Sequence, residues 1–159
     1  MPYARDIPSP DYYQVIWGKG LILLQREETG GTVSAYKVTA EEMQHVLIPP
    51  WMGHLAINTG QEPLVFANIS VRSEHTNYQP FLTRRGAAFY MVGEGNGTSF
   101  VQNPNYPAAS LGELRPNKNR ILGDFDDEPL YRLLRDKNST LRFLTRPDYF
   151  MDWFAQCLK

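Results

Sequence analysis

The chain has little of what would assign it to several specialised classes of protein. Its one cysteine, Cys157, cannot form an internal disulfide, which is typical of proteins in a reducing cytosol. No run of about twenty apolar residues could span a membrane, and residues 1–6 lack the basic and apolar regions of a secretory signal. The formal net charge of -1 gives no overall attraction to nucleic acid or to an anionic membrane. We therefore expect a cytoplasmic protein with no nucleic acid and no membrane as a partner.

What the sequence does contain is a series of short segments that are apolar or alternate between apolar and polar residues. A chain of 159 residues is long enough to fold as one domain around its own core. Turns rich in glycine, such as Gly18-Lys19-Gly20 and Gly93-Glu94-Gly95, separate the segments. Eight short strands at this spacing favour a double-sheet barrel over an α/β arrangement. The predicted strands are residues 12–16, 21–26, 33–38, 46–48, 54–58, 64–71, 87–92 and 98–101.

The last third of the chain has a different composition. Residues 103–116 are rich in proline, asparagine and alanine, which predicts an extended arm. Residues 128–135 and 147–158 have helical spacing, with Asp148 early in the second segment and Lys159 at its end. We therefore divide the chain into a barrel over residues 1–106 and an arm with helices over residues 107–159 that pack on it.

One histidine stands where it could serve a binding site. Pro49 and Pro50 interrupt an apolar strand, and the alternation that resumes after them puts His54 and Asn58 on the same face of the next strand. A histidine there can be a structural residue that only makes hydrogen bonds. It can also direct its Nε2 atom into a small barrel and bind a divalent metal. The pattern alone leaves both interpretations open.

The surrounding residues carry a resemblance to a known family. The spacing Pro49-Pro50-x-x-x-His54-x-x-x-Asn58-x-Gly60-x-Glu62-Pro63 resembles the second cupin motif of the cupin-type glucose-6-phosphate isomerases. The resemblance implies an all-β fold, the cupin double-stranded β-helix or jelly-roll barrel, with a short C-terminal helical tail. Other segments similar to the family are Pro10-Asp11 with Tyr13 and Gly18-Lys19-Gly20, Asn77-Tyr78, Arg85-Gly86, Asn103-Pro104-Asn105-Tyr106, Pro129-Leu130-Tyr131 and Arg142-Phe143-Leu144-Thr145.

The metal site that the resemblance implies is incomplete in this chain. The family uses a His-x-His pair, a glutamate seven residues later and the histidine of the second motif. Here Pro2-Tyr3-Ala4 occupies the place of the pair, Asp11 that of the glutamate, and His54 is kept. The implied divalent metal, Fe, Mn, Ni or Zn, would be held by His54 and Asp11, and the loss of two imidazoles weakens such a site by orders of magnitude. His45 and His75 are poor substitutes because one precedes an apolar strand and the other lies in a polar run.

The resemblance also implies an activity, the interconversion of glucose 6-phosphate and fructose 6-phosphate. Asp11 would take over proton transfer from the family glutamate, with a side chain one methylene shorter. Tyr13, Trp51 and Tyr78 would bind the sugar phosphate, although Tyr13 is equally well explained as aromatic core packing. Arg84 and Arg85 could grip a phosphate, but we favour a solvated surface pair.

The family resemblance also implies a homodimer and places Met1 at the first metal-binding strand, so we expect a barrel without its first strands. A start codon placed too late or a partial gene is the favoured explanation, and a split protein or a degenerate paralogue are the others. Open strand edges promote dimerisation, swapping or aggregation. The rival function is a non-catalytic cupin that binds a sugar phosphate or another small ligand, or acts as a partner subunit.

Overall fold

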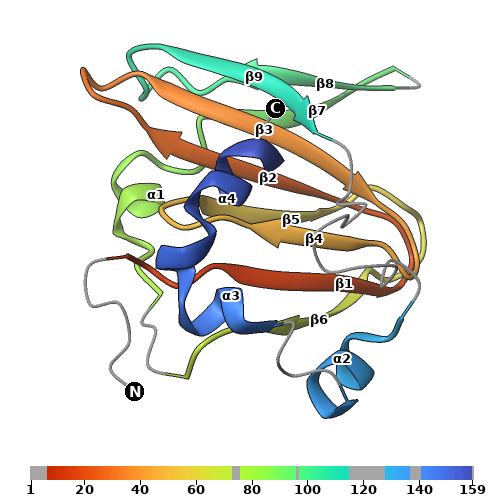
Figure 1. The fold of residues 1–159 in the computed structure, drawn as a ribbon. Helices are drawn as coiled ribbons and strands as arrows, with labels where there is room; N and C mark the ends of the chain where they lie inside the picture. Colours follow the sequence, from red (N-terminus) through yellow and green to blue (C-terminus); the bar gives the residue numbers. More distant parts are fainter. Residues whose placement is uncertain (1–6, 73–75, 96, 115–127, 137–140, 159) are drawn as a thin grey trace.

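The computed structural model describes residues 7–72, 76–95, 97–114, 128–136 and 141–158, and its strands form three sheets (Figure 1). The first sheet has the order β4-β1-β6, the second β5-β2-β3-β9, and β7 and β8 form a hairpin. The strands are β1 (Asp11–Trp17), β2 (Gly20–Glu27), β3 (Val33–Ala40), β4 (His45–Ile48), β5 (Gly53–Asn58), β6 (Val65–Ile69), β7 (Phe89–Glu94), β8 (Gly97–Gln102) and β9 (Ala109–Leu114). The helices are α1 (Gln79–Thr83), α2 (Leu130–Asp136), α3 (Arg142–Thr145), the 3-10 helix η2 (Pro147–Phe150) and α4 (Met151–Cys157).

The first two sheets pack face to face through a common core. Val15 and Ile48 of the first sheet meet Ile22 and Leu24 of the second, and each of these side chains is at most 4% exposed. Successive side chains of a strand point to opposite faces, which directs Val15 of β1 and Ile22 and Leu24 of β2 to the inner faces. The sandwich therefore has an apolar interior from which strand residues further along can project into a binding cavity.

The outer faces of both sheets are also covered. Leu21 and Leu23, on the outer face of β2, pack against residues of the β7-β8 hairpin such as Phe89 and Phe100. Tyr12, on the outer face of β1, packs against Phe143 of α3 with the rings at a steep angle. Strands buried on both faces have little polar surface, which explains why β2 is almost continuously apolar.

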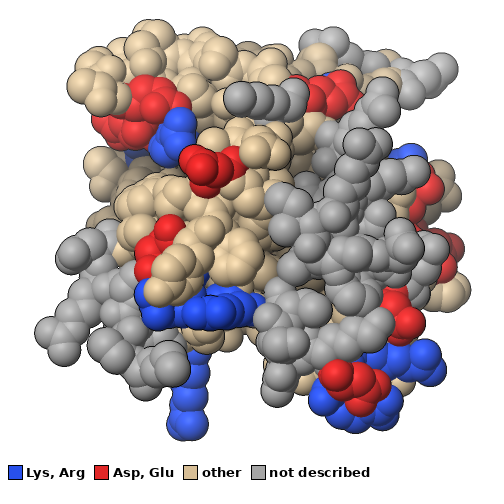
Figure 2. Space-filling model, in the orientation of Figure 1, with Lys and Arg blue, Asp and Glu red and all other residues tan. Residues whose placement is uncertain are grey.

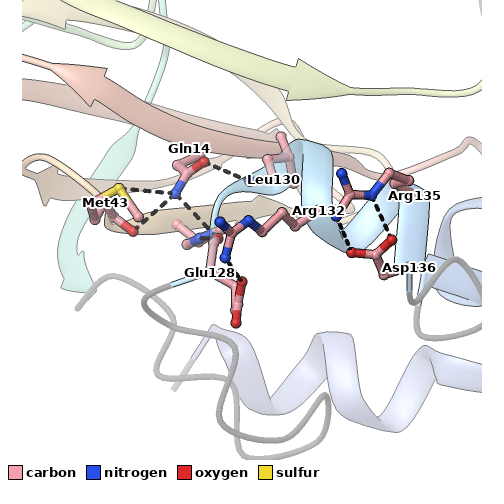
Figure 3. A network of polar contacts seen from close by, with 8 residues as sticks. Gln14, Met43, Glu128, Leu130, Arg132, Arg135 and Asp136 are labelled. Atoms are coloured by element: carbon pink, nitrogen blue, oxygen red, sulfur yellow. Dashed lines mark hydrogen bonds and ion pairs between the residues drawn. The ribbon is translucent and has the colours of Figure 1, made fainter.

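Two buried polar side chains attach the C-terminal helices to the first sheet (Figure 3). Gln14 of β1 is fully buried, and its side-chain carbonyl accepts a hydrogen bond of 2.8 Å from the backbone N–H of Leu130 at the start of α2. Its amide nitrogen lies 3.4 Å from the carbonyl oxygen of Glu128, and Nε2 of His45 lies 3.1 Å from the same oxygen. The entry to the helical segment is thus fixed by strands β1 and β4, which pair with each other.

The surface over the helical segment mixes charges of both signs (Figure 2). Arg146 and Asp148 form an ion pair of 2.7 Å, and Arg132 and Glu128 form a looser one of 3.8 Å. Among the described helices, none has both the length and the apolar character needed to cross a membrane.

The all-β class predicted from the sequence is confirmed, and the arrangement is compatible with a cupin-type fold. All eight predicted strands are present with shifts of one or two residues at most of their ends. The described strands form separate sheets, however, and do not close into a barrel. The predicted extended arm instead contains β9, which pairs with β3 in parallel over six residues. The short helices α1 and α3 were not predicted, and residues 2–4, in the place of the family's histidine pair, lie outside the described residues.

Candidate functional site

A single cavity of about 1090 Å³ brings together the five site residues that the sequence indicated. Asp11 and Tyr13 are two residues apart on β1 and so project from the same face of that strand. His54 lines the cavity from β5 in the second sheet, and Trp51 from the turn between β4 and β5. Tyr78, which also lines the cavity, is the residue immediately before α1. The roles assigned to these residues stay predictions, but the five side chains line the same cavity and could contact one ligand.

The closest contact within this group joins the two sheets. The hydroxyl oxygen of Tyr13 lies 3.0 Å from Nε2 of His54, and the two rings meet edge to face with centroids 5.4 Å apart. The Tyr13 ring also packs against Phe66 of β6 at a centroid distance of 5.2 Å. A phenol and an imidazole held by packing on both sides form a positioned donor and acceptor pair.

Burial decides the charge state of both partners. It lowers the pKa of His54 below the ordinary value, and the nearby Asp11 carboxylate and a hydrogen bond with the Met52 backbone offset this only in part. Burial, followed by Asp11 and Tyr78, raises the pKa of Tyr13. Near neutral pH the imidazole is therefore neutral and the phenol keeps its proton. The hydrogen bond between them therefore joins a neutral imidazole and a phenol, and the tautomer of His54 sets which of the two donates.

Asp11 supplies the negative charge of this part of the cavity. Its carboxylate is close enough to His54 and Tyr13 to act on the pKa of each. Its place on β1 is fixed by pairing with Ile48 of β4 on one side of the strand. A carboxylate beside a neutral imidazole and a phenol is a set that can accept, hold and return a proton.

Trp51 and Tyr78 lie at the rim of the cavity. Trp51 is 48% exposed and has a backbone φ of 62°, in the left-handed region that residues other than glycine seldom adopt. Tyr78 is 62% exposed. Large aromatic rings at a cavity mouth can contact the flat faces of a ligand, and the binding role of Trp51 and Tyr78 stays a prediction.

Another wall of the cavity is organised by Gln25, which the sequence did not single out. Gln25 of β2 is buried, donates to the hydroxyl of Tyr106 over 3.0 Å and accepts from the backbone N–H of Ala88 over 2.7 Å. Tyr106 in turn donates to the carbonyl of Gly86. The available signal was a lone glutamine at the end of an apolar strand. Arg84 is half-buried and lines this wall, whereas its neighbour Arg85 is exposed, and the surface role that we favoured for the two stays a prediction.

The described residues do not fit a divalent metal. No group of three or more histidine, cysteine, aspartate or glutamate side chains in this part of the chain could hold an ion. His54 and Asp11 are the two expected metal ligands, and the hydrogen bond with Tyr13 already occupies Nε2 of His54. Protein metal sites usually need at least three such ligands. His45 is buried at the helical segment, and His75 lies outside the described residues.

Comparison with known proteins identifies the family of the chain. A family model described as glucose-6-phosphate isomerase (GPI) matches residues 2–108. The chain is 32% identical over 106 residues to a glucose-6-phosphate isomerase of Thermococcus onnurineus, an alignment that covers 67% of this chain and 53% of the relative. It is 30% identical to one of Thermococcus gammatolerans and 29% identical to one of Pyrococcus abyssi, each covering 65% of this chain and 52% of the relative. The chain thus spans about half the length of these curated relatives. Because the family model covers well over half of the chain, the chain belongs to the glucose-6-phosphate isomerase family.

Proposed function

We propose that the cavity binds a hexose 6-phosphate and interconverts glucose 6-phosphate and fructose 6-phosphate. The observation that carries the proposal is that Asp11, Tyr13 and His54, from two facing sheets, meet in one cavity of a chain that belongs to the isomerase family. A volume of about 1090 Å³ leaves ample room for a hexose phosphate.

The reaction moves one proton between C2 and C1 of the sugar. A second proton is lost from the oxygen on one of these carbons and gained by the oxygen on the other. The carboxylate of Asp11 takes the proton from C2 of the open-chain aldose, the C1 oxygen gains a proton, and a cis-enediol forms. Asp11 then returns its proton to C1 as the C2 hydroxyl loses its own, which gives the ketose. Tyr13 and His54 form a donor and acceptor pair that can supply and collect the proton at the oxygens.

The shorter side chain of Asp11 is the weak point of this scheme. Proton transfer is efficient only when the base lies within hydrogen-bond reach of the carbon-bound proton. An aspartate on the same strand position reaches less far into the cavity than a glutamate. We therefore expect the isomerase to be slow.

Metal dependence of the family type stays a prediction for this chain. A divalent metal would polarise the C1 and C2 oxygens. His54 and Asp11 would be its ligands, and at least one further donor from outside the described residues would be required. The steps above are assigned to the protein's own side chains.

A second function is favoured by one observation. Because Nε2 of His54 is bonded to Tyr13 and no third metal ligand is present among the described residues, the cavity could hold a sugar phosphate without converting it. The alternative is a binding protein of the same fold. It differs from the isomerase in turnover and not in affinity.

The test is a coupled assay that follows the conversion of fructose 6-phosphate to glucose 6-phosphate, with and without added Mn²⁺. The proteins compared are the natural chain, Asp11→Asn and His54→Ala, and calorimetry measures the binding of fructose 6-phosphate to each. Turnover that is lost in both variants supports the isomerase. Binding without turnover in the natural chain leaves the binding protein, and the absence of both rejects the two proposals together.

A further inference from the structure

Arg84 is a cation held in place on the wall of the cavity. Its guanidinium lies over the ring of Tyr106 with a distance of 5.0 Å from Cζ to the ring centroid. Its Nη1 atom donates to the carbonyl of Asn105 over 2.6 Å. Tyr106 is itself fixed by Gln25 and Gly86, so the arginine stacks on a ring that cannot easily turn. Stacking and one hydrogen bond together orient the planar group in advance of any ligand.

The contacts of Arg84 leave one edge of its guanidinium available. Its Nε and Nη2 atoms make no hydrogen bond to any described residue. Arg26 and Arg146 use this same edge, formed by Nε and Nη2, to hold the carboxylates of Glu28 and Asp148. Two parallel N–H groups on this edge match two oxygens of a carboxylate or a phosphate.

The other charges that line the cavity do not neutralise Arg84. They are Asp11, Arg26 and Glu27, and no ion pair joins Arg84 to either acid in the described structure. Arg26 is occupied by its ion pair with Glu28. Arg84 is therefore the cavity cation that has no carboxylate partner among the described residues.

The position of Arg84 suits a ligand with two different ends. Gln25, which holds Tyr106, pairs across the sheet with Gly53, the residue before His54. The Tyr106 ring and the stacked arginine are therefore attached to the cavity wall through Gln25, separately from the contact that joins Tyr13 and His54. A hexose 6-phosphate carries its reacting carbons at one end and its phosphate at the other. A carboxylate at the phosphate end would repel that dianion, and an arginine would attract it.

We propose that Arg84 anchors the phosphate of the sugar phosphate through its Nε and Nη2 edge. This inference rests on the proposed function, because it names the residue that makes the cavity select a phosphorylated sugar. It separates recognition, at Arg84, from chemistry, at Asp11.

The test measures binding by calorimetry with fructose 6-phosphate, fructose and inorganic phosphate as the probes. The natural chain is compared with Arg84→Gln, which removes the charge, and Arg84→Lys, which keeps the charge but not the two-pronged edge. Arg85→Gln is the matched control because that side chain is exposed and contacts no cavity residue through any recorded hydrogen bond. Circular dichroism and thermal unfolding establish that each variant is folded.

We expect Arg84→Gln to bind fructose 6-phosphate roughly 10- to 100-fold more weakly than the natural chain, with a smaller loss in Arg84→Lys and none in Arg85→Gln. Unphosphorylated fructose should bind weakly and equally to all of them. If the natural chain binds fructose 6-phosphate and both Arg84 variants bind it equally well, Arg84 is not the anchor, and the proposed function survives. If Arg84→Gln does not fold, the comparison rests on Arg84→Lys. An affinity of Arg84→Lys for fructose 6-phosphate equal to that of the natural chain then overturns the inference. If the natural chain binds none of the probes, the proposed function fails and the inference with it.

Discussion

At the scale of single residues, one contact between Tyr13 and His54 ties the chemistry of the cavity to the stability of the fold. The two side chains come from facing sheets, and their 3.0 Å hydrogen bond joins a phenol to a neutral imidazole. Burial of His54 supplies that condition by lowering its pKa. Protonation of His54 would therefore cost both the hydrogen bond as it stands and the desolvation of a buried cation.

The depressed pKa of His54 predicts a loss of stability in mild acid. In the unfolded chain the imidazole takes a proton as the pH falls through its ordinary pKa, while in the folded protein it resists until the lower pKa is reached. The unfolded state binds more protons within that window, so the free energy of unfolding falls as the pH falls through it. We expect the gap in unfolding free energy between the natural chain and His54→Gln to shrink from about pH 8 to about pH 5, measured in urea. A gap that is constant or widens over this range would contradict the lowered pKa.

Asp11 offers a second prediction at this scale, which concerns reach. Asp11→Asn keeps the size of the side chain and removes the base, so it should abolish turnover while leaving the affinity for fructose 6-phosphate within a few-fold. Asp11→Glu restores the missing methylene and should raise kcat above that of the natural chain if reach is limiting. Steady-state kinetics with both variants separate the two effects. Equal kcat in the natural chain and Asp11→Asn would remove Asp11 from the catalytic role.

The resemblance to the family indicated Asp11, Tyr13 and His54, and local sequence rules explain how these residues are placed. Strand alternation places Asp11 and Tyr13 on one face, and the bend at Pro49-Pro50 puts His54 near the start of the next strand. Arg84 follows α1, and its position depends on the ring of Tyr106, twenty-two residues along the chain. No local pattern distinguishes it from Arg85 next to it.

At the scale of elements, β1 serves the cavity on one face and the helical segment on the other. Tyr13 and Asp11 face inward, while Tyr12 and Gln14 face the C-terminal helices. A displacement of the helical segment would therefore be passed through Gln14 to β1, the strand that carries the proposed base Asp11. This arrangement makes Gln14 a structural link between two parts of the chain that are 116 residues apart.

Gln14→Leu should loosen the helical segment. The substitution leaves the buried N–H of Leu130 without its acceptor and removes the donor to the carbonyl of Met43, at a cost of about 2 kcal/mol or more in unfolding free energy. Hydrogen exchange should accelerate across α2 and α3 more than across β2 and β3. Gln61→Leu is the control, since Gln61 is exposed and should change stability by less than about 0.5 kcal/mol. Uniform acceleration over the whole chain would reject a local link.

The turn between β1 and β2 gives a second prediction for an element. Gly18 has a φ of 83°, and a Cβ added there would lie 2.5 Å from the carbonyl oxygen of Pro63. Gly30 has a φ of 98° and open space around it. Gly18→Ala therefore adds a steric clash to the backbone strain, and we expect it to cost about 2 kcal/mol or more, against roughly 1 kcal/mol for Gly30→Ala. Urea unfolding measures both, and equal losses would mean that the turn shifts away from Pro63 without cost.

The limits of sequence prediction for elements also have a physical cause. Strands β1 to β8 each pair with at least one antiparallel neighbour, and most of them carry a local pattern of apolar residues. Strand β9 has two glycine or serine positions in six residues and gains its identity by parallel pairing with β3, more than seventy residues earlier. Its sequence predicts an extended arm because the pairing with β3 that makes it a strand involves residues far away in the chain.

At the scale of the whole molecule, the described strands leave both edges of the first sheet without a partner strand. In the described structure β6 and β4 each pair with β1 and with no other strand. Four large apolar side chains in these two strands are 39–53% exposed, namely Ile16 and Trp17 at the end of β1 and Val65 and Phe66 at the start of β6. Trp17 pairs with Val65 and Val15 with Phe66, so these side chains cluster at one end of the β1-β6 pair. An apolar cluster next to unpaired backbone groups is a place where another strand can add.

We expect a second copy of this chain to pair there, edge to edge across a two-fold axis, because an antiparallel pair of identical β6 strands satisfies both free edges at once. Val65→Lys puts a charge at this edge, which should shift sedimentation velocity from dimer to monomer. Leu82→Lys is the control, because Leu82 is 65% exposed on α1 and takes no part in either strand. A natural chain that stays monomeric at every concentration tested, or a Val65→Lys variant that dimerises as strongly as the natural chain, would reject the β6 edge as the contact. Asn68 of β6 lines the cavity, so pairing of β6 with a second copy should make this cavity wall more rigid. The monomeric Val65→Lys variant should therefore bind fructose 6-phosphate more weakly than the natural dimer.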